Sequence, residues 1–170
     1  MKNSGLTLPE LLITIAVLGI LASLSCLTGA ETLARQRLEN ATRTLSQSIE
    51  QARSHAMRNQ TPCGMGLMGT TWQAQEGGSL PACSPDATPL QEQGFGDGGL
   101  HVTHNMPHEL RFSSNGLVLD GGTVVLTMRG TSLRRCLVMA LPLGVVRLGK
   151  YIGDTTSAPD STACQPDPSL

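Results

Sequence analysis

Aromatic residues are scarce in this chain of 170 residues, which contains two Phe, one Trp and one Tyr. With so few rings, the protein lacks a platform on which successive bases of a single-stranded nucleic acid can stack. The core must therefore be built mainly from aliphatic side chains.

An excess of charge of either sign is also missing. The sequence has 12 Lys and Arg against 13 Asp and Glu, which gives a formal net charge of −1. A balance this close to neutral gives no bulk electrostatic attraction for nucleic acid.

The common enzyme motifs are absent, since the sequence has no G-x-S-x-G, no P-loop and no H-E-x-x-H. His101, His104 and His108 form an H-x2-H-x3-H cluster. On a strand, residues three apart point to opposite faces, and Pro107 interrupts any regular element before the third histidine. We therefore interpret these as surface histidines, and we predict no catalytic site, no metal site and no cofactor.

Cysteines are few but informative. Cys26 lies in an apolar segment and is expected to be a small buried hydrophobe. The other four, Cys63, Cys83, Cys136 and Cys164, are spaced by 20, 53 and 28 residues, without the C-x2-C pair of a zinc knuckle. An even number suggests disulfides in an exported protein. Three pairings exist, and we favour Cys63–Cys83 with Cys136–Cys164 because each closes one local loop.

A long uncharged stretch runs from Leu11 to Ala30. About 20 apolar residues match the roughly 30 Å hydrocarbon core of a bilayer, so we predict a transmembrane segment. A secretory signal peptide is the alternative, with Lys2 as its positive flank. Its apolar core would be shorter, and it would not carry the carboxylate of Glu10 between flank and core.

Glu10 has two interpretations. Thr7-Leu8-Pro9-Glu10 fits the capping box S/T-x-x-E, in which Thr7 is the N-cap. A carboxylate at the mouth of an intramembrane helix is nevertheless costly, and capping does not require one there. We therefore favour a dedicated role for Glu10 in addition to capping.

The residues around Glu10 resemble the processing signal of type IV prepilins and type II secretion pseudopilins, through the run Gly5-Leu6-Thr7-Leu8-Pro9-Glu10-Leu11-Leu12-Ile13. The resemblance implies that a prepilin peptidase cuts between Gly5 and Leu6 and methylates the new amine of Leu6. It also implies that Glu10 neutralises the N-terminal amine of a neighbouring subunit during assembly. The sequence departs from the family at Leu6, usually Phe, and at Pro9, usually aliphatic.

Helical periodicity continues beyond the apolar stretch. Apolar residues recur at spacings of three and four at Ala34, Leu38, Ala41, Leu45, Ile49, Ala52 and Ala56. Pro62 ends the pattern. We predict one helix over Leu8–Asn59, on the order of 75 Å long, with its first half transmembrane and its second half amphipathic.

The rest of the chain predicts an antiparallel β-sheet head. Strands are expected at 63–68, 71–74, 100–103, 109–113, 117–119, 124–128, 135–141 and 145–148, with hairpin turns at 114–116 and 120–122 and a loop over 77–99. The fold class is α+β, a helical spine packed on a sheet. The predicted divisions are a leader (1–5), a transmembrane and assembly half-helix (6–30), an amphipathic half-helix (31–60), a head (61–153) and a loose C-terminal tail (154–170).

Three further stretches, Gln51–Arg58, Leu110–Gly116 and Leu143–Leu148, are similar to the FimT/GspH group of minor pilins and type II secretion pseudopilins. The resemblance implies a minor type IV pilin in pilus assembly or priming, or alternatively a minor pseudopilin. It implies a single-pass inner-membrane protein with a periplasmic head, later part of a pilus or pseudopilus. The implied partners are prepilin peptidase, other pilins or pseudopilins, and the inner membrane.

DNA is a further partner to consider, because some FimT-type pilins bind DNA for uptake in natural transformation through a Gly-Arg-x-Arg strand end. Here the matching residues are Gly144-Val145-Val146-Arg147, so the first Arg is replaced by Val145. The candidate DNA-binding residues are Arg147, Lys150, Arg134 and Arg135. The alternative role for these residues is a charged sheet edge that discourages aggregation. The alternative to membership of the pilin family is an unrelated single-span protein with a periplasmic domain.

Overall fold

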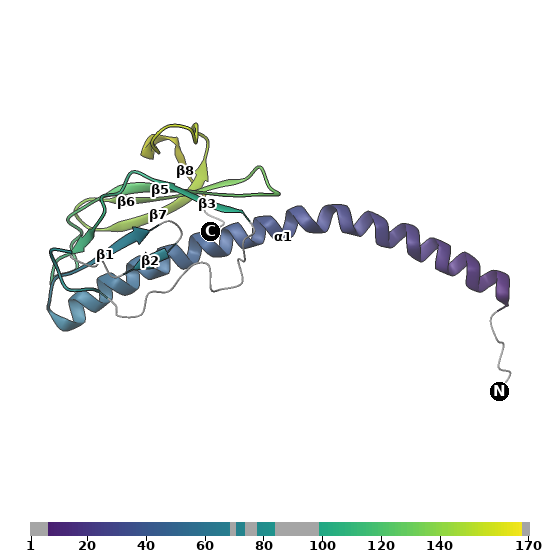
Figure 1. Ribbon diagram of the computed structural model, residues 1–170, viewed down its shortest axis with the longest axis horizontal. Coiled ribbons are helices and arrows are strands. Elements are labelled where there is room, and N and C mark those ends of the chain that lie inside the picture. The colour runs from purple at the N-terminus through teal and green to yellow at the C-terminus, as the bar shows by residue number, and fades with distance from the viewer. Residues whose placement is uncertain (1–6, 69–70, 74–77, 84–98, 168–170) are drawn as a thin grey trace.

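A long helix and two antiparallel sheets form the computed structural model of the chain (Figure 1). The structure describes residues 7–68, 71–73, 78–83 and 99–167, without the side chains of 22–28, 68 and 71–73. Helix α1 spans Leu8–Asn59, which confirms the bounds predicted from periodicity. Its second half lies along the head, and its first half projects away from it (Figure 1).

Helix α1 ends where the sequence predicts a stop. Gln60 takes a left-handed conformation with φ of 50°, and its backbone N–H donates to the carbonyls of Ala56 and Met57. Pro62, two residues later, cannot continue the helix. The chain therefore turns back and enters the first strand along the second half of α1.

The strands divide between two sheets. The small sheet has the order β2-β1-β4, and the large one has the order β3-β5-β6-β7-β8. The strands are β1 (Cys63–Met68), β2 (Thr71–Gln73), β3 (Leu100–His104), β4 (Leu110–Phe112), β5 (Gly122–Met128), β6 (Arg134–Ala140), β7 (Val145–Tyr151) and β8 (Cys164–Pro166). The predicted α+β spine and sheet head is confirmed, with the sheet in two parts.

The segment between the two sheets differs from its prediction. We expected a hairpin turn at 120–122, but β4 pairs with β1 and the chain then crosses to β5 in the other sheet. The strand expected at 117–119 is a single bridge between Phe112 and Val118. Backbone bonds from Ser113 N–H to the Leu117 carbonyl and from Leu119 N–H to the Arg111 carbonyl frame this one bridge, and the Val118 N–H donates to the Pro142 carbonyl at 3.0 Å.

The C-terminal tail is not loose over its described part, so that prediction is wrong. A 3-10 helix, η1 (Ser161–Ala163), leads into β8, which pairs with the last three residues of β7. The tail lies against an outer cluster on the face of the large sheet away from α1, formed by Val125, Cys136, Val138, Tyr151 and Cys164. The Asn105 amide fixes it further by donating to the Pro159 carbonyl at 2.8 Å. Composition alone gave no sign of these long-range partners.

Both favoured disulfides are present, namely Cys63–Cys83 and Cys136–Cys164. The first joins the start of β1 to the segment between β2 and β3. The second joins the middle of β6 to β8 and so ties the tail to the outer face of the sheet. Cys26 lies outside the described side chains.

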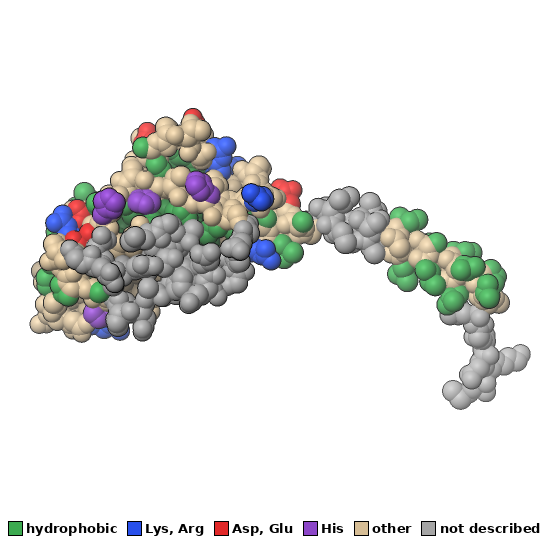
Figure 2. All heavy atoms as spheres, in the orientation of Figure 1, with side chains coloured by type: hydrophobic (Ala, Val, Ile, Leu, Met, Phe, Trp, Pro, Cys, Tyr) green, Lys and Arg blue, Asp and Glu red, His purple; other side chains and the backbone are tan. Residues whose placement is uncertain are grey.

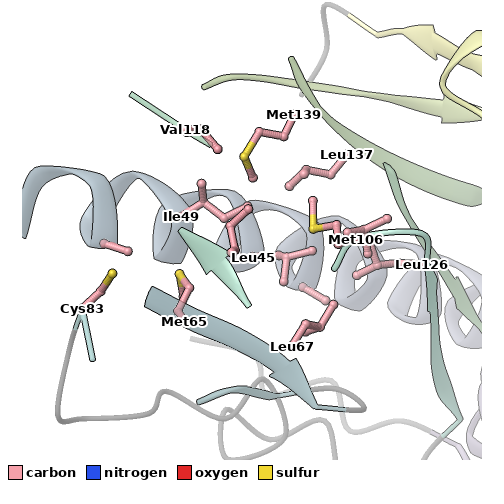
Figure 3. Packing of buried hydrophobic residues seen from close by; sticks show 14 of the residues in the cluster. Leu45, Ile49, Met65, Leu67, Cys83, Met106, Val118, Leu126, Leu137 and Met139 are labelled. Carbon is pink, nitrogen blue, oxygen red and sulfur yellow. The ribbon is translucent and has the colours of Figure 1, made fainter. Parts of the chain in front are cut away.

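The main core lies between α1 and the two sheets. Leu38, Leu45 and Ile49 of α1 are fully buried, and each such side chain contributes about 1.5–3 kcal/mol of burial free energy. Figure 3 shows the apolar face of α1 with β1 on one side and β6 on the other; its labelled core residues include Leu45, Ile49, Met65, Leu67, Leu126, Leu137 and Met139. Among the described strands none pairs across the two sheets, and α1 packs against both of them.

An ion-pair cluster joins the helix, the large sheet and the tail. The Arg135 side chain is only 1% exposed, and its guanidinium donates to Glu39 of α1 and to Asp167 after β8, both at 2.6 Å. Arg35 adds a longer contact of 3.4 Å to Glu39. The cluster lies where α1 leaves the head.

Acid should weaken this cluster. The hydrogen bond from Arg135 holds the pKa of Glu39 below its usual range, although burial acts in the opposite direction. The stabilisation from Glu39 is therefore complete above the unfolded pKa of about 4.3 and is lost as pH falls through the lower folded pKa. In urea unfolding between pH 7 and pH 3, we expect Glu39→Gln to lose less stability than the wild type. The exposed Glu31→Gln should follow the wild-type curve, and a Glu39→Gln curve parallel to wild type would contradict the prediction.

Candidate functional site

The first half of α1 presents apolar side chains to solvent. Nine large hydrophobic residues between Leu8 and Leu21 are 48–74% exposed. Figure 2 shows them covering the projecting end of the molecule. Monomeric soluble proteins rarely leave such a surface uncovered, so it is a candidate site for contact with other molecules. Among the described residues, no helix is both long and apolar enough to cross a membrane.

Glu10 lies in the first turn of this half-helix, with an exposed side chain. Its Oε2 accepts hydrogen bonds from the Thr7 backbone N–H at 3.0 Å and from the Thr7 hydroxyl at 2.9 Å. Both bonds use the same oxygen, and a carboxylate offers about four acceptor positions, so capping leaves room for a cation. The predicted cleavage residues Gly5 and Leu6 lie outside the described residues.

The four candidate DNA-binding residues do not form one patch. Arg135 and Lys150 face each other across β6 and β7, so they share one face of the sheet. Alternation along the strands puts Arg134 and Arg147 on the opposite face. Arg134 is half-buried and donates to the Gly153 carbonyl at 2.8 Å.

Arg135 is a wrong prediction as a DNA contact. Its guanidinium is buried and bound to two carboxylates, so it is not available to a phosphate. Arg147 and Lys150 are exposed but lie on opposite faces.

Among the described residues, no group of three or more His, Cys, Asp or Glu side chains is placed to hold a metal ion.

The sequence did not predict the partners of Glu39. Arg43 lies four residues after Glu39, at the spacing of a helical ion pair, whereas the structure pairs Glu39 with Arg35 and Arg135. Arg135 is 96 residues away in the chain, and no local pattern reports a contact at that distance.

An apolar half-helix with a carboxylate at its start, continuous with a helix packed on a disulfide-bonded sheet head, defines the class of pilin-like subunits. The comparisons with known proteins agree with this class and identify the family. The chain belongs to the GspH family: the family described as type II transport protein GspH matches residues 41–142. The prokaryotic N-terminal methylation motif matches residues 1–25. The resemblance to minor pilins and pseudopilins is thereby confirmed.

A solved structure shows the same fold. The type IV minor pilin FimU of Pseudomonas aeruginosa (strain PAO1) is similar, with a TM-score of 0.54, over 75% of this chain and 96% of that chain. The two sequences are 20% identical, so the likeness extends to the fold alone. No protein in the curated collection matches the chain.

Proposed function

We propose that this protein is a structural subunit, not an enzyme, that is processed at its N-terminus and then built into a filament through α1. The observation that carries the proposal is the exposed Glu10 at the start of an uncovered apolar half-helix. Apolar helices of neighbouring subunits would pack into a bundle and cover one another. Inside that bundle Glu10 would pair with a positively charged group.

Processing makes that positive charge available. Prepilin peptidase would cut between Gly5 and Leu6 and methylate the new N-terminus, as the matched methylation motif implies. The amine of one subunit then pairs with Glu10 of its neighbour. Pairing compensates a charge that would otherwise be buried alone among apolar side chains.

Before assembly, residues 6–30 would lie in the inner membrane as a single pass, with the head in the periplasm. The absence of charge from Leu11 to Ala30 supports this placement. The two disulfides support it as well, because disulfides form and persist in the oxidising periplasm.

Two systems are candidates for the one that contains this filament, the type IV pilus and the type II secretion system. We propose a minor type IV pilin that takes part in pilus assembly or priming. The second candidate is a minor pseudopilin of type II secretion, favoured by the family description that matches residues 41–142. Deleting the gene should abolish surface pili in the first case and protein secretion in the second.

The test of the proposal is Glu10→Gln in the full-length precursor. Mass spectrometry of the mature N-terminus should show the leader removed and one methyl group gained, as in wild type. Incorporation into filaments should fall by more than about 100-fold, because leaving a buried charge unpaired costs about 3–5 kcal/mol.

Glu31→Gln is the matched control, since it removes a carboxylate from the same helix near the head. It should assemble normally. Wild-type incorporation of Glu10→Gln would contradict the assembly role, and an uncut wild-type precursor would contradict the processing.

A further inference from the structure

An apolar surface lies at the end of the head farthest from the projecting half of α1. It consists of five exposed side chains, 39–59% accessible, which we call the distal apolar surface: Leu117, Leu119, Leu141, Leu143 and Val145. Its location follows from two contacts. Gly116 packs on Met57 near the end of α1, whereas Arg135, near the other end of β6, contacts Glu39.

Two separate segments are held together to form this surface. The Val118 N–H donates to the Pro142 carbonyl at 3.0 Å, which joins the segment between β4 and β5 to the turn between β6 and β7. Gly144 has φ of +66° and lies so close to Val118 that a Cβ atom there would clash. Val118 itself is buried, so the leucines on either side of it point outward. The surface is therefore a built feature of the head.

Exposed apolar residues are concentrated here. Outside the first half of α1, the described residues include eight large hydrophobics that are exposed, and five of them belong to the distal apolar surface. Scattered exposure of single residues is normal, but clustering of this kind marks an interaction site.

The charges around the surface favour an anionic group on the partner. Arg111 and Asp120 form a two-point ion pair at 2.7 and 2.9 Å, so they neutralise each other. Arg147 is exposed, on the same face of β7 as Val145, and makes no ion pair with any described residue. Arg147 thus places at the edge of the distal apolar surface a positive charge that pairs with none of the described carboxylates.

Lipid and DNA fit this surface poorly. Ala34, beside the turn between β5 and β6, is 23 residues before Met57, which is about 35 Å along the helix axis. A membrane around the first half of α1 is therefore far from the surface. DNA binding relies on several phosphate contacts, whereas five apolar side chains and one arginine suit a protein.

We infer that the distal apolar surface docks the head of a different pilin subunit, one that places an apolar patch and a carboxylate opposite Arg147. The inference rests on the proposed function, in which packing of α1 brings other pilin heads alongside with the same polarity. A second copy of this chain is a poorer match. The opposite end of its head exposes Arg37 and Arg129 together with Glu31, so it offers Arg147 no net negative charge.

The direct test uses a photo-crosslinking amino acid in place of Leu143 in the full-length protein, expressed in cells that assemble filaments. Ile152 is the matched control, because it is 58% exposed against 59% for Leu143 and lies outside the surface. The Leu143 position should crosslink to the head of another protein that bears an N-terminal methylation motif, identified by mass spectrometry. The Ile152 position should give little of this product, because its side chain lies outside the surface that the partner contacts.

Substitutions give the second arm. For this arm the photo-crosslinking amino acid replaces Leu119. Leu143→Asp and Arg147→Glu should each reduce crosslinking from that position about tenfold or more, whereas Ile152→Asp should not. Both variants should still be cleaved after Gly5 and retained in the membrane, which separates failure at this surface from failure of the proposed function. Equal products from positions 143 and 152, no product from 143, or a product with DNA, lipid or a second copy of this chain would overturn the inference.

Discussion

Replacing Arg135 with alanine is expected to lower the free energy of unfolding by about 3 kcal/mol, with a fall in melting temperature of about 6–12 °C. The guanidinium is 1% exposed and holds Glu39 and Asp167, each 27% exposed, at 2.6 Å. Its removal leaves a cavity and two half-buried carboxylates near each other. Thermal and urea unfolding of the full-length protein in detergent measure the effect.

Arg147→Ala is the control for the Arg135 prediction, because it removes an exposed arginine from the neighbouring strand and should change stability by less than about 0.5 kcal/mol. A double-mutant cycle provides a stricter test. Once Arg135 is alanine, adding Glu39→Ala should cost little, because the two residues share one interaction. Additive losses would show that the cluster does not act as a unit.

Breaking the Cys136–Cys164 disulfide should have a comparable effect. Converting both residues to serine is expected to cost about 3.5 kcal/mol, because the bond closes a loop with a sequence separation of 28 residues. It should also free the tail from the outer cluster, so that protease cleaves the segment between Tyr151 and Cys164 at lower concentration than in wild type.

The pair Cys63 and Cys83 provides the matched control for tail release. Changing both to serine removes a disulfide of separation 20, and stability should fall, but the tail should keep its protection against protease. If both double variants expose the tail equally, the disulfide at Cys164 has no specific part in holding it.

The parts of the fold that the sequence predicted depend on neighbours within a few residues. Apolar spacing located α1 from Leu8 to Asn59, and Thr7 with Glu10 indicated its capping box. Most strands of the head were located to within a few residues, because alternation and turn residues act locally.

The parts that could not be predicted depend on distant contacts. The division into two sheets follows from β4 pairing with β1, nearly fifty residues earlier in the chain (Cys63 with Phe112). The tail has a polar composition typical of a loose segment; its disulfide to Cys136 was the favoured pairing, but the contact of Asp167 with Arg135 had no signal in the sequence. Likewise, Arg135 resembled a surface charge until the structure placed Glu39 beside it.

The packing of both sheets against α1 has a consequence for the order of folding. The helix is synthesised first and its contacts are local, whereas the Glu39–Arg135 contact closes a loop of 96 residues. Contacts of that separation form late, because loop-closure entropy must be overcome first. We therefore expect hydrogen exchange during refolding to protect α1 and the β5–β6–β7 meander early, and protection of the tail to appear last. The helix then serves as the template on which each sheet docks separately.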